Sequence, residues 1–252
     1  MLNTKPPGKR TGYSNPDCYA NTLDDCCSEI NQEHYISKKL LKRLGRFEAE
    51  GFAWRPKKGP VGLNLQARIL CERHNTALSP LDAMITDLYD LMRAWQDRKE
   101  LGERVLDGED LERWALKALC GLVMSGGVRP GRDQANETEP SIPRKYARIL
   151  FGEAEMPKRW GFRTAHAVFG HLTPASVRCR VDWRDGVAMP DSIVMSLVGF
   201  TWSTTLAEVN VPPGEAYRPS DFAIGETGRL TIRWNGTKRK GPQVQLFEKK
   251  ES

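Results

Sequence analysis

The clearest hydrophobic pattern in the chain is a helical periodicity that begins just after residue 79. Ser79 can cap a helix, Pro80 suits the first helical position, and Asp82 can close a capping box. Apolar residues then recur every three or four positions, as on one face of an amphipathic helix: Leu81, Met84, Ile85, Leu88, Leu91, Met92 and Trp95. The pattern predicts a helix that starts at Ser79 and Pro80 and ends near Gln96 or Asp97.

Two short segments upstream of this helix favour β-strands. Residues 33–37 (EHYIS) alternate in polarity, and residues 66–71 (QARILC) read as a second strand that pairs with the first. Leucines at helical spacing predict a short helix over residues 38–44, which Gly45 ends. Residues 51–64 are rich in glycine, proline and basic residues and predict a loop. The resulting order is strand, loop, strand, helix.

The rest of the chain predicts helices first and strands later. Asp107 or Asp110 can cap a helix that ends at residues 125–127 (SGG), and a shorter helix fits residues 144–151. From residue 160 onward, polar and apolar residues alternate, which predicts a mostly antiparallel sheet. We therefore expect an α+β protein with three parts. Residues 1–100 contain the strands and the long helix described above, residues 101–158 form a helical connection, and residues 159–252 form a mostly β part.

Composition and charge narrow the class of protein. The 252 residues carry a formal net charge of +6, which favours a polyanionic partner. The N-terminal residues are polar and basic without an apolar signal segment, and no apolar run is long enough to span a membrane. We therefore expect a cytoplasmic protein with reduced thiols and no membrane association. The sequence does not indicate protein partners.

Cysteine and histidine cluster in the first third of the sequence. Cys18, Cys26 and Cys27 precede a C-x-x-H pair formed by Cys71 and His74. Structural zinc takes four ligands, so five candidates are one too many. The sequence favours Zn²⁺ at Cys18, Cys27, Cys71 and His74, with Cys26 as the spare thiol. The alternative is that these cysteines are ordinary small residues.

A second group of residues suits phosphodiester hydrolysis. His34 can act as a general base, because its unperturbed pKa lies near 6.5. Glu33 and Asn75 offer oxygen ligands for a catalytic Mg²⁺ or Mn²⁺. Asn75 directly follows a candidate zinc ligand, so the zinc site would fix where its amide oxygen points.

Basic residues lie close to these candidates in the sequence. Such residues suit contacts with phosphate, although a basic helix face is as often simply a solvated surface. The candidate nucleic-acid-binding residues are Lys38, Lys39, Lys42, Arg43, Arg46, Arg55, Lys57 and Lys58.

The acidic-His pair, the upstream cysteines and the C-x-x-H-Asn that opens into a helix resemble the ββα-metal nucleases of the HNH superfamily. The similarity covers residues 12–96 approximately and is to the branch with a structural zinc, which includes phage junction-resolving endonucleases. It implies that residues 1–100 form an HNH-like, zinc-containing ββα-metal nuclease domain. His34 would be the general base, and Glu33 and Asn75 would hold the catalytic divalent cation.

Two functions are therefore expected as alternatives. The first is a metal-dependent endonuclease that hydrolyses DNA, with RNA as a further substrate class, in bacterial or phage DNA conflict. The second is a zinc-stabilised nucleic-acid-binding module without cleavage activity. The first requires Glu33, His34 and Asn75 to converge on one cation, whereas the second requires only the cysteines and His74.

Overall fold

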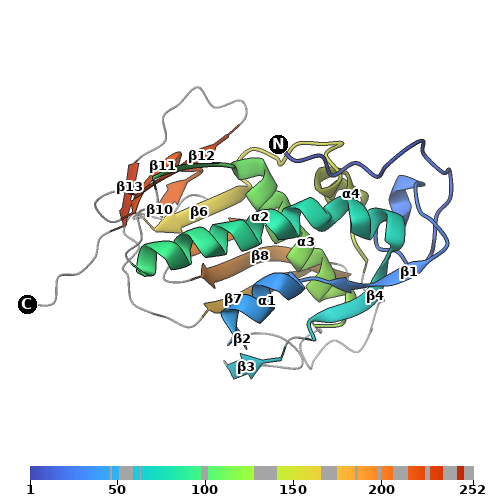
Figure 1. Cartoon of the computed structure of the whole chain (residues 1–252). Coiled ribbons are helices and arrows are strands. Elements are labelled where there is room, and N and C mark those ends of the chain that lie inside the picture. The colour runs from blue at the N-terminus through green and yellow to red at the C-terminus, as the bar shows by residue number, and fades with distance from the viewer. Residues whose placement is uncertain are drawn as a thin grey trace, which may run out of the picture.

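A computed structural model describes residues 1–45, 47–50, 59–62, 64–97, 102–127, 141–165, 175–184, 187–197, 200–206, 215–224, 228–234 and 243–246. Within these ranges the protein is α+β, as the sequence predicts, with helices packed against mostly antiparallel sheets (Figure 1). His166 and His171 lie outside the described residues.

A two-stranded hairpin followed by a long helix forms the N-terminal part. Strand β1 (Ile30–His34) pairs antiparallel with β4 (Gln66–Cys71), and α2 (Glu72–Gln96) follows β4 directly. Ile30 lies opposite Cys71, and His34 lies opposite Gln66. The predicted pairing of the two segments is confirmed, but β1 ends before residues 35–37. Ser37 instead caps the next helix, so the chain has to leave the strand before it.

Helix α2 begins eight residues before the predicted start. Cys71 is its N-cap, and Pro80 lies inside the helix. Tertiary contacts fix this start, because the Glu72 N–H donates to the Glu29 carbonyl at 2.9 Å. The Ser79 hydroxyl bonds back to the Asn75 carbonyl at 3.4 Å instead of capping. A local capping signal was thus wrong, whereas the predicted end of the helix near Gln96 is confirmed.

Helix α1 (Lys38–Leu44) lies between the two strands in sequence and packs beside α2 (Figure 1). The Ser37 hydroxyl accepts the Leu40 N–H at its start, and Gly45 adopts a positive φ of 65° at its end. Leu40 and Leu41 are buried on the inner side. The predicted helix and its glycine stop are both confirmed.

Helix α3 (Gly108–Met124) lies at the centre of the molecule. It packs against α2 on one side and against the larger sheet on the other (Figure 1). The Asp107 carboxylate caps it by accepting the N–H groups of Glu109 and Asp110. Its side chains are buried nearly throughout, charged ones included. Helix α4 (Arg144–Leu150) packs against α3 and against the short η1 (Asn21–Leu23).

The C-terminal part confirms the predicted antiparallel character, and it recruits strands from earlier in the chain. A seven-stranded sheet has the order β10-β6-β9-β8-β7-β2-β3, and a four-stranded sheet has the order β13-β11-β12-β5. The strands are β2 (Phe47–Glu50), β3 (Gly59–Val61), β5 (Glu103–Asp107), β6 (Gly161–Ala165), β7 (Ala175–Arg184), β8 (Val187–Leu197), β9 (Phe200–Thr205), β10 (Glu215–Tyr217), β11 (Asp221–Ile224), β12 (Gly228–Arg233) and β13 (Gln243–Leu246).

Two of the recruited strands are paired in parallel. β2 runs parallel to β7, and β5 runs parallel to β12. Both parallel partners come from much later in the chain, so the sheets include residues from each of the three predicted parts. Residues 103–107 lie within the predicted helical connection, but they form strand β5, which is paired along its full length with β12.

Candidate metal centre

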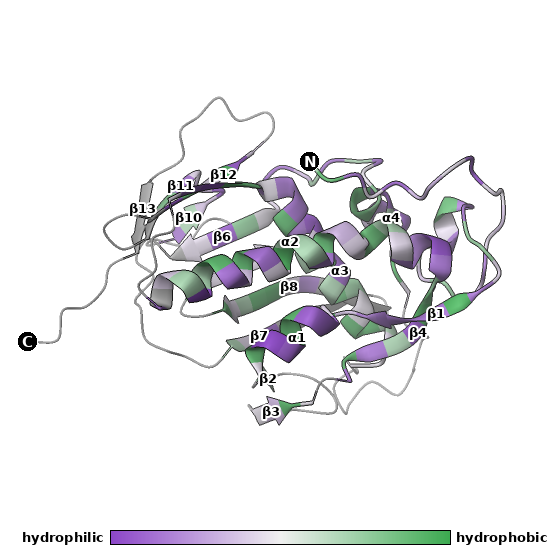
Figure 2. Cartoon of the chain, in the orientation of Figure 1, coloured by the Kyte–Doolittle hydropathy of each residue, from purple (hydrophilic) through white to green (hydrophobic). Residues whose placement is uncertain are grey.

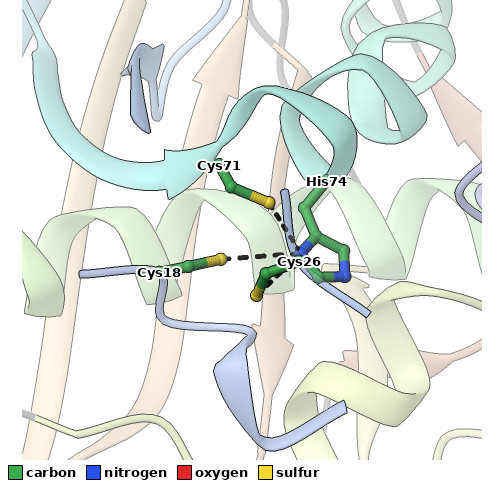
Figure 3. Close-up of side chains that lie close together, drawn as sticks. All are labelled: Cys18, Cys26, Cys71 and His74. Carbon is green, nitrogen blue, oxygen red and sulfur yellow. Dashed lines mark hydrogen bonds between the residues drawn. The ribbon is translucent and has the colours of Figure 1, made fainter. Parts of the chain in front are cut away.

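Four buried side chains meet at the start of α2 (Figure 3). The His74 Nδ1 lies 3.2 Å from the Cys71 Sγ, 3.5 Å from the Cys18 Sγ and 3.8 Å from the Cys26 Sγ. All four candidate ligand atoms lie within 4.8 Å of one another, and none of the four residues is exposed. We call this group the Cys3His cluster.

The spacing within the Cys3His cluster matches a tetrahedral zinc site. Zinc–sulfur and zinc–nitrogen bonds of about 2.3 and 2.05 Å at a tetrahedral angle place sulfur and nitrogen about 3.6 Å apart. The three observed separations, from 3.2 to 3.8 Å, bracket this value. Three thiols and one imidazole are also a common donor set of structural zinc. The residues therefore fit Zn²⁺.

Local structure brings the four ligands together. Cys71 caps α2 and His74 lies three residues later, so both side chains point to the same side of the first turn. Cys18 is placed by its N–H bond to the Asn15 carbonyl at 3.0 Å. Cys26 is placed by its N–H bond to the Tyr13 carbonyl at 2.8 Å.

The spare thiol is Cys27, not Cys26. The Cys27 Sγ lies outside the cluster, where it accepts the Arg73 N–H at 3.3 Å and approaches the Glu29 carbonyl at 3.6 Å. The two adjacent cysteines therefore face different surroundings, and only Cys26 faces the His74 ring. The expected ligand set was therefore wrong at this one position.

The thiols of the Cys3His cluster shift one another's pKa strongly. Hydrogen bonds from Cys18 and Cys26 lower the pKa of the Cys71 thiol, and the same contacts with Cys26 and Cys71, together with burial, raise the pKa of Cys18. Thiolates are the form that binds metal, so a cation bound here would require these thiols to lose their protons.

The imidazole is held by packing on its far side. Its Nδ1 faces the three sulfurs, and its ring lies against Phe151, with 4.6 Å between ring centroids. The Nε2 of His74 is buried and has no hydrogen-bond partner among the described residues. The ring orientation therefore assigns Nδ1 as the ligand atom.

An ion pair beside the cluster ties the N-terminal segment to α2. The Arg73 guanidinium pairs with the Asp25 carboxylate at 2.9 Å and donates to the Lys9 carbonyl at 3.1 Å. The same carboxylate accepts the Thr11 N–H at 3.0 Å. Arg73 thus fixes the chain on both sides of Cys18.

Glu33, expected to hold a catalytic cation, is engaged in a buried ion pair. Its Oε1 lies 2.6 Å from the Lys117 Nζ on α3, with 3% of the Glu33 side chain and 1% of the Lys117 side chain exposed. Lys117 also lies 2.9 Å from an Asp82 carboxylate oxygen and donates to the His34 carbonyl at 3.0 Å. Burial raises the pKa of Glu33, and Lys117 opposes that effect.

His34, the expected general base, has a half-buried side chain at the end of β1. Burial lowers the pKa of its imidazole, and the nearby charges of Lys38 and Lys117 lower it further. The ring is therefore neutral near pH 7, which is the state in which an imidazole can accept a proton.

The structure does not bring Asn75 to this pair. Among the described residues, no hydrogen bond or ion pair joins the Asn75 side chain to Glu33 or His34. Cys71 faces Ile30 at the opposite end of β1 from His34, and Asn75 lies on the turn of α2 that follows. The α2 residue that shares a partner with Glu33 is Asp82, about two turns further along.

The Cys3His cluster has no counterpart at Glu33. Within the described ranges, it is the one group of three or more histidine, cysteine or acidic side chains spaced to hold a metal. The expected catalytic Mg²⁺ or Mn²⁺ site stays a prediction, and the oxygen atoms around Glu33 already surround an ammonium.

Four of the expected phosphate-binding residues are described, and all four are exposed on α1: Lys38, Lys39, Lys42 and Arg43. Arg43 forms a surface ion pair with Asp90 of α2. The other four, Arg46, Arg55, Lys57 and Lys58, lie outside the described residues.

Lys117 is the functional candidate that the sequence pattern did not single out. It stands among buried apolar residues of α3, between Leu116 and Ala118. A lone lysine within the apolar stretch of residues 114–124 is the available signal, because a buried ammonium requires acidic partners. The acidic partners of Lys117 come from β1 and α2, so the residues around Lys117 in the sequence do not identify them.

No family model, curated protein or solved structure matches this chain. The chemistry of its sites is therefore inferred from its own residues. A membrane-crossing helix is absent from the described part of the chain, since none of its helices combines the necessary length and apolarity.

Proposed function

We propose that this chain is a nucleic-acid-binding protein whose N-terminal hairpin–helix module is stabilised by zinc. The observation that carries the proposal is the cationic outer side of α1. Its sequence (KKLLKRL) holds four cations and no acid, and all four are exposed while Leu40 and Leu41 are buried. Figure 2 shows hydrophilic residues along much of this helix.

The geometry around α1 supports a role in binding rather than a purely solvated surface. The helix is capped at both ends, and it follows β1 directly, so its cations are presented from a rigid base. Neutralising phosphates with such cations supplies most of the sequence-independent affinity for nucleic acid. A net charge of +6 over the whole chain acts in the same direction.

The proposed module holds its zinc for structure. All four candidate ligands are protein side chains, which leaves no open coordination position for water or substrate. The ion would join the segment before the hairpin, the end of β4 and the start of α2. We therefore assign it the role of fixing this corner, with α1 and the hairpin as the surface that meets the nucleic acid.

A metal-dependent endonuclease of the HNH type is the second candidate function. It is favoured by the strand–strand–helix order with zinc at its corner and by the neutral, half-buried His34 at the end of β1. It requires Glu33 to leave Lys117, or another oxygen ligand to replace it. Because that carboxylate is buried in an ion pair, we rank binding without cleavage first.

Binding is tested with two matched triple variants. Lys38→Gln/Lys39→Gln/Lys42→Gln neutralises α1, and Arg144→Gln/Lys145→Gln/Arg148→Gln neutralises three exposed cations on α4, a helix of the same length. Fluorescence anisotropy with duplex DNA, duplex RNA and single strands is measured over a salt series. We expect the α1 variant to reduce the slope of log K against log salt by about 2.7 on duplex DNA, at about 0.9 per phosphate contact.

Equal losses in both triple variants, or no binding of any nucleic acid by the parent at low salt, would contradict the proposal. The same preparations are incubated with plasmid and Mg²⁺ or Mn²⁺, alongside His34→Ala. We expect no cleavage. Cleavage by the parent that falls by about 10²–10⁴-fold in His34→Ala would establish the second candidate instead.

A further inference from the structure

A second buried polar group lies where β1, α2 and α3 meet. It consists of the Glu33 carboxylate, the Asp82 carboxylate, the backbone carbonyl of His34 and the Lys117 ammonium, and we call it the lysine cluster. Four oxygen atoms surround the Lys117 Nζ: Glu33 Oε1 at 2.6 Å, Asp82 Oδ2 at 2.9 Å, Asp82 Oδ1 at 3.0 Å and the His34 carbonyl at 3.0 Å.

These oxygen atoms resemble the ligands of a hard metal cation. An ammonium has three N–H donors, so four close oxygens exceed what it can satisfy with separate hydrogen bonds. In agreement, the Glu33 Oε1 has a 2.6 Å contact with the Nζ but does not meet the angular requirement of a hydrogen bond. Two carboxylates and a backbone carbonyl are also the ligand types that Mg²⁺, Ca²⁺ and Mn²⁺ take from proteins.

The oxygen atoms of Asp82 and of the His34 carbonyl are held in place independently of the lysine. The Asp82 Oδ1 accepts the Trp114 Nε1–H at 3.2 Å, and the His34 carbonyl belongs to the last residue of β1. The cluster is also reachable from solvent, because 27% of the Asp82 side chain is exposed although Glu33 and Lys117 are almost fully buried. A small cation thus has both a set of ligands and a route to them.

We propose that Glu33, Asp82 and the His34 carbonyl form a cation site whose resident occupant is the Lys117 ammonium, and that removing this ammonium opens the site to a divalent cation. In the parent protein, Lys117 then occupies the position that a metal ion would take, and it prevents metal from binding the Glu33 carboxylate next to His34. The site does not depend on nucleic-acid binding, so it stands or falls separately from the function proposed above.

The test compares the parent with Lys117→Ala by Mn²⁺ binding, measured by electron paramagnetic resonance, and by thermal unfolding with and without Mn²⁺ or Mg²⁺. We expect Lys117→Ala to bind one additional Mn²⁺ per chain, at least tenfold more tightly than any site in the parent. Its Tm should be lower than the parent's without divalent cation and should recover in part when Mn²⁺ is added. The parent's Tm should not change.

Two control variants define the site. Lys117→Arg keeps the positive charge, so its Mn²⁺ binding should match the parent's. Lys117→Ala combined with Glu33→Gln and Asp82→Asn removes the ammonium and both carboxylates, so it should fold without extra cation and lose the additional Mn²⁺.

Three results would overturn the proposal. Lys117→Ala that is folded but binds no additional Mn²⁺ would show that the oxygens do not form a cation site. Equal Mn²⁺ binding by the neutral triple variant would place the ion elsewhere. An unfolded Lys117→Ala that neither Mn²⁺ nor Mg²⁺ restores would show that only the lysine can balance these charges. Nucleic-acid binding by the parent is read in a separate assay and affects none of these outcomes.

Discussion

The Cys3His cluster and the lysine cluster solve one problem in two ways. Each gathers several electron-rich atoms in the protein interior, where unbalanced negative charge is costly. The Cys3His cluster contains sulfur and nitrogen donors and no cationic side chain, so its thiolate form would need a bound cation to balance its charge. The lysine cluster contains oxygen donors and includes its own cation, Lys117.

The difference follows from ligand chemistry and from where the chain supplies each group. Soft thiolates select zinc, and no lysine ammonium could hold three of them in tetrahedral positions. Carboxylates accept an ammonium or a hard metal ion with similar ease, so a lysine from α3 can take the central position. Zinc bound at the Cys3His cluster would couple the folding of this part of the chain to zinc supply, whereas Lys117 already balances the carboxylates of the lysine cluster without a metal.

Removing a zinc ligand should have the largest effect. We expect Cys71→Ser to lose stoichiometric zinc and to unfold the N-terminal part, because structural zinc contributes about 10–16 kcal/mol in small zinc domains and a typical domain has only about 5–15 kcal/mol of stability. Elemental analysis and circular dichroism measure both outcomes.

Cys27→Ser is the matched control for that experiment. Its Sγ lies outside the Cys3His cluster, so this variant should keep one zinc per chain and the parent's Tm. Zinc loss in Cys27→Ser with retention in Cys26→Ser would reverse the ligand assignment.

Weakening the lysine cluster should have the next largest effect. Asp82→Asn removes one of the two carboxylates around Lys117 and should cost about 1.5–3 kcal/mol, the usual worth of hydrogen bonds to charged groups. Asp90→Asn on the same helix removes a carboxylate from the exposed pair with Arg43 and should cost at most about 1 kcal/mol. Urea unfolding of the two variants measures the difference, and equal costs would mean that the Lys117 contacts contribute nothing beyond a surface pair.

The close approach of α3 to the end of β1 can be tested through Gly121. A Cβ at this position would lie 2.1 Å from the Tyr35 Cβ, so Gly121→Ala forces α3 away from the strand that supplies Glu33. The clash should cost about 1–3 kcal/mol and outweigh the roughly 1 kcal/mol by which alanine favours a helix. A Tm equal to or above the parent's would show that the helix can shift without loss.

The smallest effect concerns the titration of His34. Burial first, and then Lys38 and Lys117, lower the pKa of this imidazole below 6.5, so the folded state binds fewer protons than the unfolded chain just below that pH. This contribution to stability is therefore present above pH 6.5 and is lost as the pH falls through the folded pKa. NMR titration of Lys38→Ala should move the His34 pKa part of the way back toward 6.5, and an unchanged value would exclude Lys38 as a cause.

Features with a local signal were predictable from the sequence. Helix α1 needed only its leucine spacing, Ser37 and Gly45, and α3 needed only Asp107 and its apolar run. The pairing of β1 with β4 followed from two alternating segments at a plausible separation. In each case the residues that define the element lie within a few positions of it.

Features set by contacts far along the chain were not predictable. The choice of Cys26 over Cys27 depends on which of the two thiols faces His74 at the start of α2. The early start of α2 depends on the Glu29 carbonyl, which accepts the Glu72 N–H and overrides the capping pattern at Ser79 and Pro80. The oxygen shell around Lys117 is assembled from three separate elements, so no stretch of sequence contains it.

The parallel pairing of β2 with β7 and of β5 with β12 has a consequence for synthesis on the ribosome. All ligands of the Cys3His cluster and all members of the lysine cluster lie within the first 117 residues, so both can assemble while later residues are still being added. Strands β2 and β5 can pair with β7 and β12 only after more than a hundred further residues have been synthesised. During that interval they present unpaired edges, which are prone to bind other chains.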